Sequence, residues 1–184
     1  VMAILERAGL EATNVVMNMV NGGSFAVTAA KAGRSGKRKK PAVVQWLLEQ
    51  EQRIGLGTPR PFRDFEERVF EHRQSLRALI LALVADGKKI VGYGASTKGN
   101  VILQFCGLTA REIPCIADVN PDKMGRVTPG TNIPIVSEQE ARAMKPDYFL
   151  VLPWHFKAGI LKREAEFLAR GGQMIFPMPE IEIV

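Results

Sequence analysis

The feature that most constrains this chain is a regular alternation of short apolar runs with helical segments after Lys88. Each apolar run is only four or five residues long, which suits a strand, and the segments between the runs have helical spacing. Such alternation predicts βαβ units, and therefore an α/β fold with a mostly parallel sheet and helices on both faces. The expected strands are 90–93, 113–117, 133–136, 148–152 and 173–176, and the expected helices are 97–106, 138–144 and 156–170.

The residues before Lys88 follow a different pattern. A short helix is expected at 1–8, followed by β-rich runs at 12–19 and 24–30. Asn21-Gly22-Gly23 between the two runs is typical of a hairpin turn, because Asn and Gly tolerate positive φ. A helix followed directly by a hairpin is typical of the end of a domain. Residues 1–32 are therefore interpreted as the remnant of a larger upstream domain.

Two helices are expected between the hairpin and the α/β region. One begins at Pro41 and the other follows Pro61 and ends at Asp86-Gly87, with apolar residues at helical spacing. The chain is thus divided into the hairpin segment, a basic linker with lead-in helices at 33–87, and an α/β domain at 88–184.

The chain carries a net charge of +6, and five of its positive charges lie in one short loop: Arg34, Lys37, Arg38, Lys39 and Lys40. Without them, basic and acidic residues nearly balance. Nucleic-acid binding through this loop is one hypothesis, but the loop lacks the interleaved aromatic side chains on which bases stack. A solvated linker is the favoured interpretation, and no nucleic acid is expected as a partner.

Other function classes are disfavoured by simple counts. The longest apolar run, 79–85, is far shorter than the ~20 residues of a membrane-spanning helix, so no membrane partner is expected. Cys106 and Cys115 lie in apolar surroundings and are expected to be buried free thiols, which agrees with a cytoplasmic location. The two histidines are not at metal-ligand spacing, so no metal site is expected.

The strongest local motif is a glycine-containing turn between an expected strand and an expected helix. Glycines allow a phosphate to approach the backbone, and a helix N-terminus offers unpaired N–H groups and partial positive charge. Thr97 stands where the dinucleotide fingerprint has its third glycine, so an unspecified phosphate or nucleotide is the inference. The alternative is that the glycines only permit a tight turn. The candidate residues are Gly94, Ala95, Ser96, Lys98, Gly99 and Asn100.

Two further segments are expected at the same edge of the sheet. Asp118 ends the next strand, where nucleotide-binding folds place an acid against a ribose hydroxyl, although a role in the following turn is the alternative. Pro153, Trp154 and His155 follow the expected strand 148–152. His155 is a candidate for a polar ligand contact or for a helix cap, whereas Trp154 is interpreted mainly as packing. Ligands of open parallel sheets bind beyond the carboxyl ends of the strands.

These motifs, taken in order, resemble the C-terminal domain of S-adenosylmethionine-dependent sugar C-methyltransferases. The resemblance extends from the hairpin to Pro177-Met178-Pro179, although Asn21 replaces a usual His and Ala26 stands where Arg is common. The segments that carry it are Gly92 to Asn100, Asp118 to Gly125, Pro129-Gly130-Thr131, Ile133-Pro134-Ile135, Pro146 to Phe156, Arg163-Glu164 and Gly171-Gly172.

The resemblance implies a three-part enzyme that ends in a Rossmann-like domain. In that family a zinc-binding module comes first, a central domain holds S-adenosylmethionine, and a nucleotide-linked keto-sugar binds between the central and the last domain. A base removes a proton next to the sugar ketone, and the enolate attacks the cofactor methyl. The family's catalytic His and Tyr precede the segment present here, so this chain is expected to lack the catalytic, cofactor and zinc sites.

For this chain the resemblance implies binding of a nucleotide-diphosphate sugar beside the upstream methyltransferase domain. Lys98 is then expected to complement the diphosphate, and His155 to contact sugar or ribose. The alternative from another class is a stand-alone module that binds NAD or a CoA-like nucleotide without catalysis.

Overall fold

The computed structural model describes residues 1–20, 23–33 and 41–184. The chain divides into two compact units, Val1–Glu67 and Arg68–Val184, and the division falls inside the long helix α3 (Arg60–Ala85). The predicted turn residues Asn21 and Gly22, and the five basic loop residues, lie outside the described residues.

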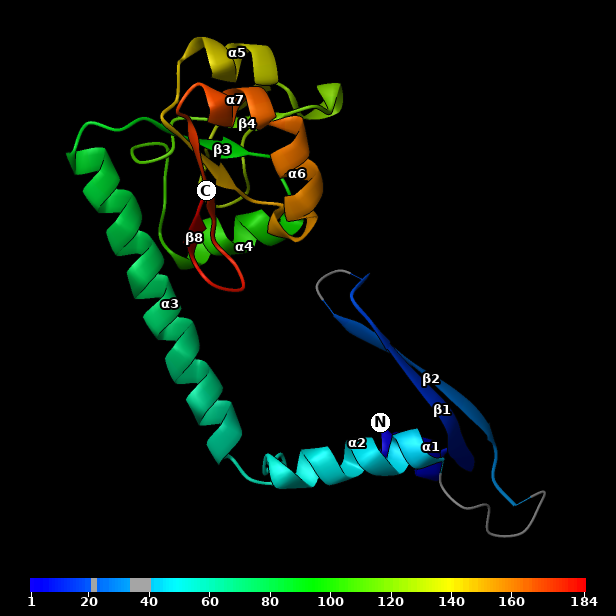
Figure 1. Cartoon of the computed structure of the whole chain (residues 1–184). Coiled ribbons are helices and arrows are strands. Elements are labelled where there is room, and N and C mark those ends of the chain that lie inside the picture. Colours follow the sequence, from blue (N-terminus) through cyan, green and yellow to red (C-terminus); the bar gives the residue numbers. More distant parts are fainter. Residues whose placement is uncertain (21–22, 34–40) are drawn as a thin grey trace. The chain divides into compact units, whose positions relative to one another are not determined.

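The first unit contains a helix, a two-stranded hairpin and a second helix. Helix α1 (Met2–Arg7) precedes strands β1 (Leu10–Asn18) and β2 (Ser24–Lys31), which pair antiparallel and confirm the predicted hairpin. Helix α2 (Ala42–Arg53) begins directly after Pro41, because the fixed φ of proline suits a helix start. All these elements are shown in Figure 1.

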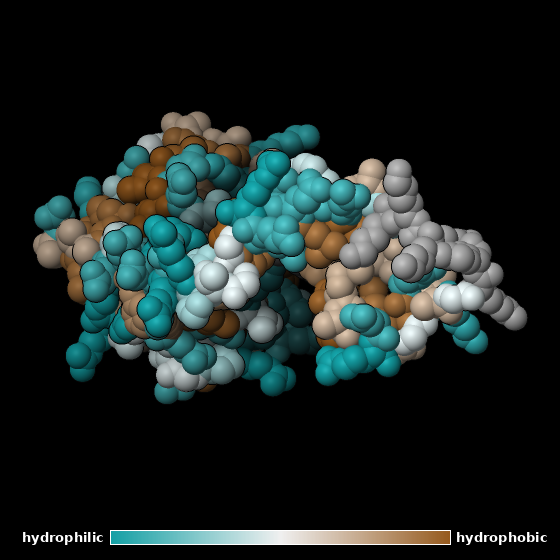
Figure 2. Space-filling model, turned by 90° about the horizontal axis from the view of Figure 1, so that it is seen from below, coloured by the Kyte–Doolittle hydropathy of each residue, from teal (hydrophilic) through white to brown (hydrophobic). Residues whose placement is uncertain are grey.

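Much of the apolar surface of the first unit is exposed, and Figure 2 shows hydrophobic residues in brown at the surface of the molecule. Its large hydrophobic residues include several that are more than half exposed: Val1, Ile4, Val16, Met17, Met19, Val20 and Phe25. Alternate strand residues face the same side, and on one side of the hairpin Val15 pairs with Val27 and Met17 with Phe25.

The second unit contains a six-stranded sheet with the order β5-β4-β3-β6-β7-β8. The first five strands in this order are parallel and only β8 runs antiparallel, so the predicted mostly parallel sheet is confirmed. The strands are β3 (Ile90–Tyr93), β4 (Ile116–Asp118), β5 (Ile135–Ser137), β6 (Tyr148–Val151), β7 (Gln173–Phe176) and β8 (Glu182–Ile183).

Helices cover both faces of this sheet, as predicted. One buried cluster joins α3 and α4 (Thr97–Phe105) to strand residues such as Leu150, and a second joins α5 (Glu138–Ala143), α6 (Lys157–Arg163) and α7 (Ala165–Ala169) to strand residues such as Phe149. Neighbouring residues of one strand enter opposite clusters because strand side chains alternate between faces. Cys106 and Cys115 are buried and unpaired, as expected.

Several boundaries differ from the prediction. Strands β4 and β5 begin later than expected, each after a proline (Pro114 and Pro134), which has no N–H to donate to the ladder. The single helix expected at 156–170 is instead a 3₁₀ turn at Trp154–Phe156 followed by α6 and α7, with a break at Glu164. Strand β8 was not predicted from the sequence.

Within the described parts of the chain, no helix combines the length and the apolar character needed to cross a membrane.

Candidate ligand-binding edge of the sheet

The three segments predicted to form a site meet at one edge of the sheet. Strand β3 pairs in parallel with β4 on one side and with β6 on the other, and Tyr93 is in register with both Ala117 and Val151. The glycine turn, Asp118 and the segment 153–155 therefore follow three neighbouring strands at their carboxyl ends. In open α/β sheets this edge, where strand order reverses, is where ligands bind.

Close packing at this edge explains two of its glycines. Gly94 has a φ of +76°, and a Cβ on it would lie 2.8 Å from the Pro153 Cγ. A Cβ on Gly99 would lie 2.5 Å from the Leu152 Cβ. The backbone at Gly94 and Gly99 therefore packs against the side chains of Pro153 and Leu152, which follow β6. This geometry accounts for the glycines as part of a tight turn.

Helix α4 begins with a side-chain cap at this edge of the sheet. The Ser96 Oγ accepts a hydrogen bond from the Gly99 N–H at 3.0 Å, so Ser96 is the N-cap. The first N–H groups of any α-helix have no partner inside the helix. The N-terminus of α4 carries partial positive charge, and together with the Lys98 ammonium it suits an anion.

Asp118 is buried, and its carboxylate accepts hydrogen bonds from neighbouring protein groups. Its Oδ2 accepts from the Ala95 N–H at 2.8 Å and from the Lys123 Nζ at 3.0 Å, and its Oδ1 accepts from the Asn120 N–H at 2.8 Å. Burial alone would raise the pKa of Asp118, but these hydrogen bonds outweigh it and hold the pKa below its ordinary value. The geometry favours the alternative role, in which Asp118 fixes the turn. The predicted ribose contact stays a prediction.

Two polar atoms at this edge are buried without a hydrogen bond among the described residues. They are the Asn100 Oδ1, in the first turn of α4, and the His155 Nδ1. Buried polar groups in proteins are nearly always hydrogen-bonded, so each of these atoms suits a water molecule or a ligand group as its missing partner. His155 also packs edge-on against Trp154, with ring centroids 5.9 Å apart. Trp154 packs against the second buried cluster, in agreement with the interpretation as mainly packing, and its predicted ligand contact stays a prediction.

The His155 imidazole and the Lys98 ammonium influence each other electrostatically. Burial lowers the pKa of His155 below its ordinary value, and the Lys98 charge lowers it further. Removal of this charge by Lys98→Ala is expected to raise the pKa of His155. The Hε1 resonance of His155 in an NMR pH titration measures the change, with the resonance of His72, the chain's other histidine, as the reference. An unchanged His155 midpoint would show that Lys98 does not act on His155.

A cavity of about 230 Å³ opens at the same edge. Three predicted site residues line it, namely Gly94, Asp118 and Pro153, and we call it the edge cavity. Phe156, the end of the expected segment Pro153 to Phe156, lines it as well. The sequence did not indicate the other lining residues: Tyr93, Ala117, Val119, Glu138, Gly159, Ile160 and Arg163. A signal for part of this set was present, because residues 156, 159, 160 and 163 have the i, i+3, i+4, i+7 spacing of one helix face.

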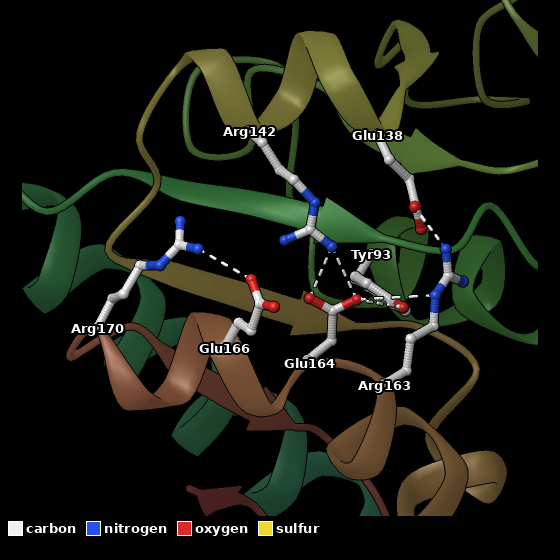
Figure 3. A network of polar contacts seen from close by, with 7 residues as sticks. All are labelled: Tyr93, Glu138, Arg142, Arg163, Glu164, Glu166 and Arg170. Carbon is white, nitrogen blue, oxygen red and sulfur yellow. Dashed lines mark hydrogen bonds and ion pairs between the residues drawn. The ribbon is translucent and has the colours of Figure 1, made fainter.

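A buried ion pair supports this part of the sheet (Figure 3). The Arg142 Nη2 donates to both carboxylate oxygens of Glu164, at 2.8 and 2.7 Å, and the Tyr93 hydroxyl donates to Glu164 Oε1 at 2.9 Å. Burial and the neighbouring Glu164 both raise the pKa of Tyr93, so its hydroxyl stays protonated and donates. The helix break at Glu164 accompanies this turn of the side chain into the interior.

Comparison of the chain with known proteins identifies the class to which this fold and edge belong. The chain belongs to the family described as C-methyltransferase C-terminal domain, which matches residues 19–179. Over 181 residues it is 39% identical to the C-methyltransferase NovU of Streptomyces niveus, an alignment that covers 98% of this chain. The chain spans only 43% of the length of that relative.

Proposed function

We propose that this chain is the substrate-binding C-terminal part of an S-adenosylmethionine-dependent C-methyltransferase that acts on a nucleotide-linked keto-deoxysugar. The observation that carries the proposal is the meeting of three segments at the carboxyl edge of the sheet: the glycine turn, the N-terminus of α4 with Lys98, and the residues that follow β6. Strand order β5-β4-β3-β6-β7 is that of a Rossmann-type sheet, and it supports binding of a nucleotide at this edge.

In this proposal the chain's own residues bind and orient the substrate. The N-terminus of α4 and the Lys98 ammonium hold the diphosphate, because each presents positive charge to it. The unpartnered Asn100 and His155 atoms make the neighbouring polar contacts. Asp118 and Lys123 keep the turn in place, since Lys123 Nζ also donates to the Ala95 carbonyl at 2.8 Å. Fixed positioning of the substrate is this chain's contribution to the rate.

S-adenosylmethionine supplies the methyl group in methyltransferases, and we place its site outside this chain. The edge does not suit it, because the positive sulfonium would be repelled by Lys98 and by the N-terminal turn of α4. The deprotonating base and a zinc module are likewise assigned to the remainder of the whole enzyme. Residues 1–32 are then the end of its central domain, an assignment supported by the exposed apolar side chains of the hairpin.

Lys98→Ala is the direct test of the substrate site. Calorimetric titration of the chain with thymidine diphosphate is expected to show binding weakened by about 1.5–3 kcal/mol, the strength of a hydrogen bond to a charged group. Lys162→Ala is the control, because Lys162 lies on α6 and lines a different cavity. Equal affinity of Lys98→Ala and the unaltered chain would remove Lys98 from the site.

The same titration separates the competing functions. Tight binding of S-adenosylmethionine by this chain would contradict the proposed division of sites. Stabilisation by NAD but not by nucleoside diphosphates would instead support the stand-alone nucleotide module.

A further inference from the structure

The edge cavity has an apolar lining that the diphosphate site does not use. Val119, Pro153, Phe156 and Ile160 contribute side chains to it. Phe156 is 63% exposed and Val119 is 60% exposed, so both present apolar surface to solvent beside the cavity. Apolar walls of this kind suit the faces of a planar ring better than a sugar, whose hydroxyl groups would lose their hydration against them.

One ion pair gives this cavity a polar side. Arg163 on α6 donates from Nη2 to the Glu138 Oε2 at the start of α5, and both residues line the cavity. Their side chains are 49% and 22% exposed, so solvent or a ligand reaches them. A guanidinium has five N–H donors and a carboxylate has several acceptor positions, so one ion pair leaves further donors and acceptors on both residues.

Arg163 also lies near a second carboxylate, which helps to fix its position. The Arg163 Nε lies 4.0 Å from the Glu164 Oε1, and Arg142 and Tyr93 hold the Glu164 carboxylate (Figure 3). A donor and an acceptor are therefore presented side by side on ordered helices. The polar edge of a nucleobase carries donors and acceptors side by side as well, whereas a diphosphate has acceptors only.

We propose that the edge cavity receives the base of the bound nucleotide, with Arg163 donating to and Glu138 accepting from the polar edge of the base. This inference rests on the proposed function, since it requires a nucleotide whose diphosphate lies at the glycine turn. Gly94, Asp118 and Pro153 belong both to that turn region and to the cavity lining, so a ligand held at the turn continues directly into the cavity. Arg163 and Glu138 then determine base specificity.

The test compares ligands with and without a base. The chain is titrated with uridine, thymidine, adenosine and guanosine diphosphates and with inorganic pyrophosphate, and the tightest nucleotide is kept. Arg163→Gln is expected to weaken that nucleotide at least tenfold and to change pyrophosphate binding less than twofold. Glu138→Gln is expected to reduce discrimination among the four bases. Arg170→Gln is the matched control, because Arg170 forms a similar but exposed pair with Glu166.

Each outcome decides between the inference and the underlying function. Nucleotide affinity that is unchanged in Arg163→Gln would overturn the base site while leaving the proposed function intact. Pyrophosphate and nucleotide affinities that fall equally would also overturn it, because Arg163 would then act on the phosphates. Failure of the unaltered chain to bind any of the nucleotides would instead contradict the proposed function. If Arg163→Gln does not fold, Arg163→Lys replaces it, since it keeps the charge but loses the planar fork.

Discussion

Replacement of Glu164 by alanine is expected to lower the free energy of unfolding by about 3 kcal/mol. Loss of one partner of a buried ion pair costs about 3–5 kcal/mol because the other charge stays behind without compensation. The lower end applies here because the Arg142 side chain is 41% exposed and water reaches it. The Tyr93 hydroxyl also loses its acceptor. The unfolding transition of the second unit in chemical denaturant measures this change in the free energy of unfolding.

Glu166→Ala is the matched control for this prediction. Glu166 is two residues away and pairs with Arg170, but both side chains are more than three-quarters exposed. Its removal is expected to change stability by less than about 1 kcal/mol, as for exposed ion pairs in general. The double variant Glu164→Ala/Arg142→Ala is expected to lose less than the sum of the two single variants, because neither charge is left alone. Equal effects of Glu164→Ala and Glu166→Ala would contradict the buried network.

The second large effect is expected at Ile80 in α3. Ile80 is fully buried in the cluster that joins α3 and α4 to the sheet. Ile80→Ala is therefore expected to lower the free energy of unfolding by about 2–5 kcal/mol, through lost burial and a cavity. Denaturant unfolding followed by circular dichroism measures this loss.

Leu81 provides the comparison on the same helix. It is the next residue of α3 and is 39% exposed, so Leu81→Ala is expected to cost clearly less than Ile80→Ala. Similar losses for the two variants would mean that α3 does not pack on the sheet. A large difference would support inclusion of residues from Arg68 onward in the α/β unit. The sequence division at 87/88 would then describe the start of the sheet, and not the start of the folded unit.

The proposed site contains two kinds of residue. Lys98, Asn100 and His155 present charge or unpartnered polar atoms to a ligand, whereas Asp118, Ser96 and the glycines shape the turn that carries them. This division explains why an acid after β4 need not contact ribose here. Its carboxylate already accepts three hydrogen bonds from the protein.

The parts of the fold determined by local patterns were predictable from the sequence. Ser137 and Glu140 predict a capping box, and both of its hydrogen bonds are present at the start of α5. The apolar runs predict the five parallel strands, because a strand buried on both faces needs a continuous apolar run. The hairpin strands β1 and β2 follow from the same local reasoning.

The break at Glu164 was not predictable in this way. Residues 156–170 have helical spacing throughout, and nothing local distinguishes Glu164 from the exposed Glu166. The distinction comes from Arg142 and Tyr93, which are distant in the sequence and meet Glu164 only in the folded chain. The position of Arg163 in the lining of the edge cavity was not predictable for the same reason, because its partner Glu138 lies on another helix.

The sequence by itself determined the α/β class, the positions of the five parallel strands to within a few residues, and the three segments that form the candidate site. These follow from periodicity, glycine and proline placement, and the rule that parallel strands end at a common edge. Only the tertiary structure decided that the Asp118 carboxylate is hydrogen-bonded within the protein, that Glu164 is buried, and that a cavity with Arg163 and Glu138 adjoins the glycine turn. Each of these depends on contacts between residues far apart in the chain, whose energies no local pattern contains.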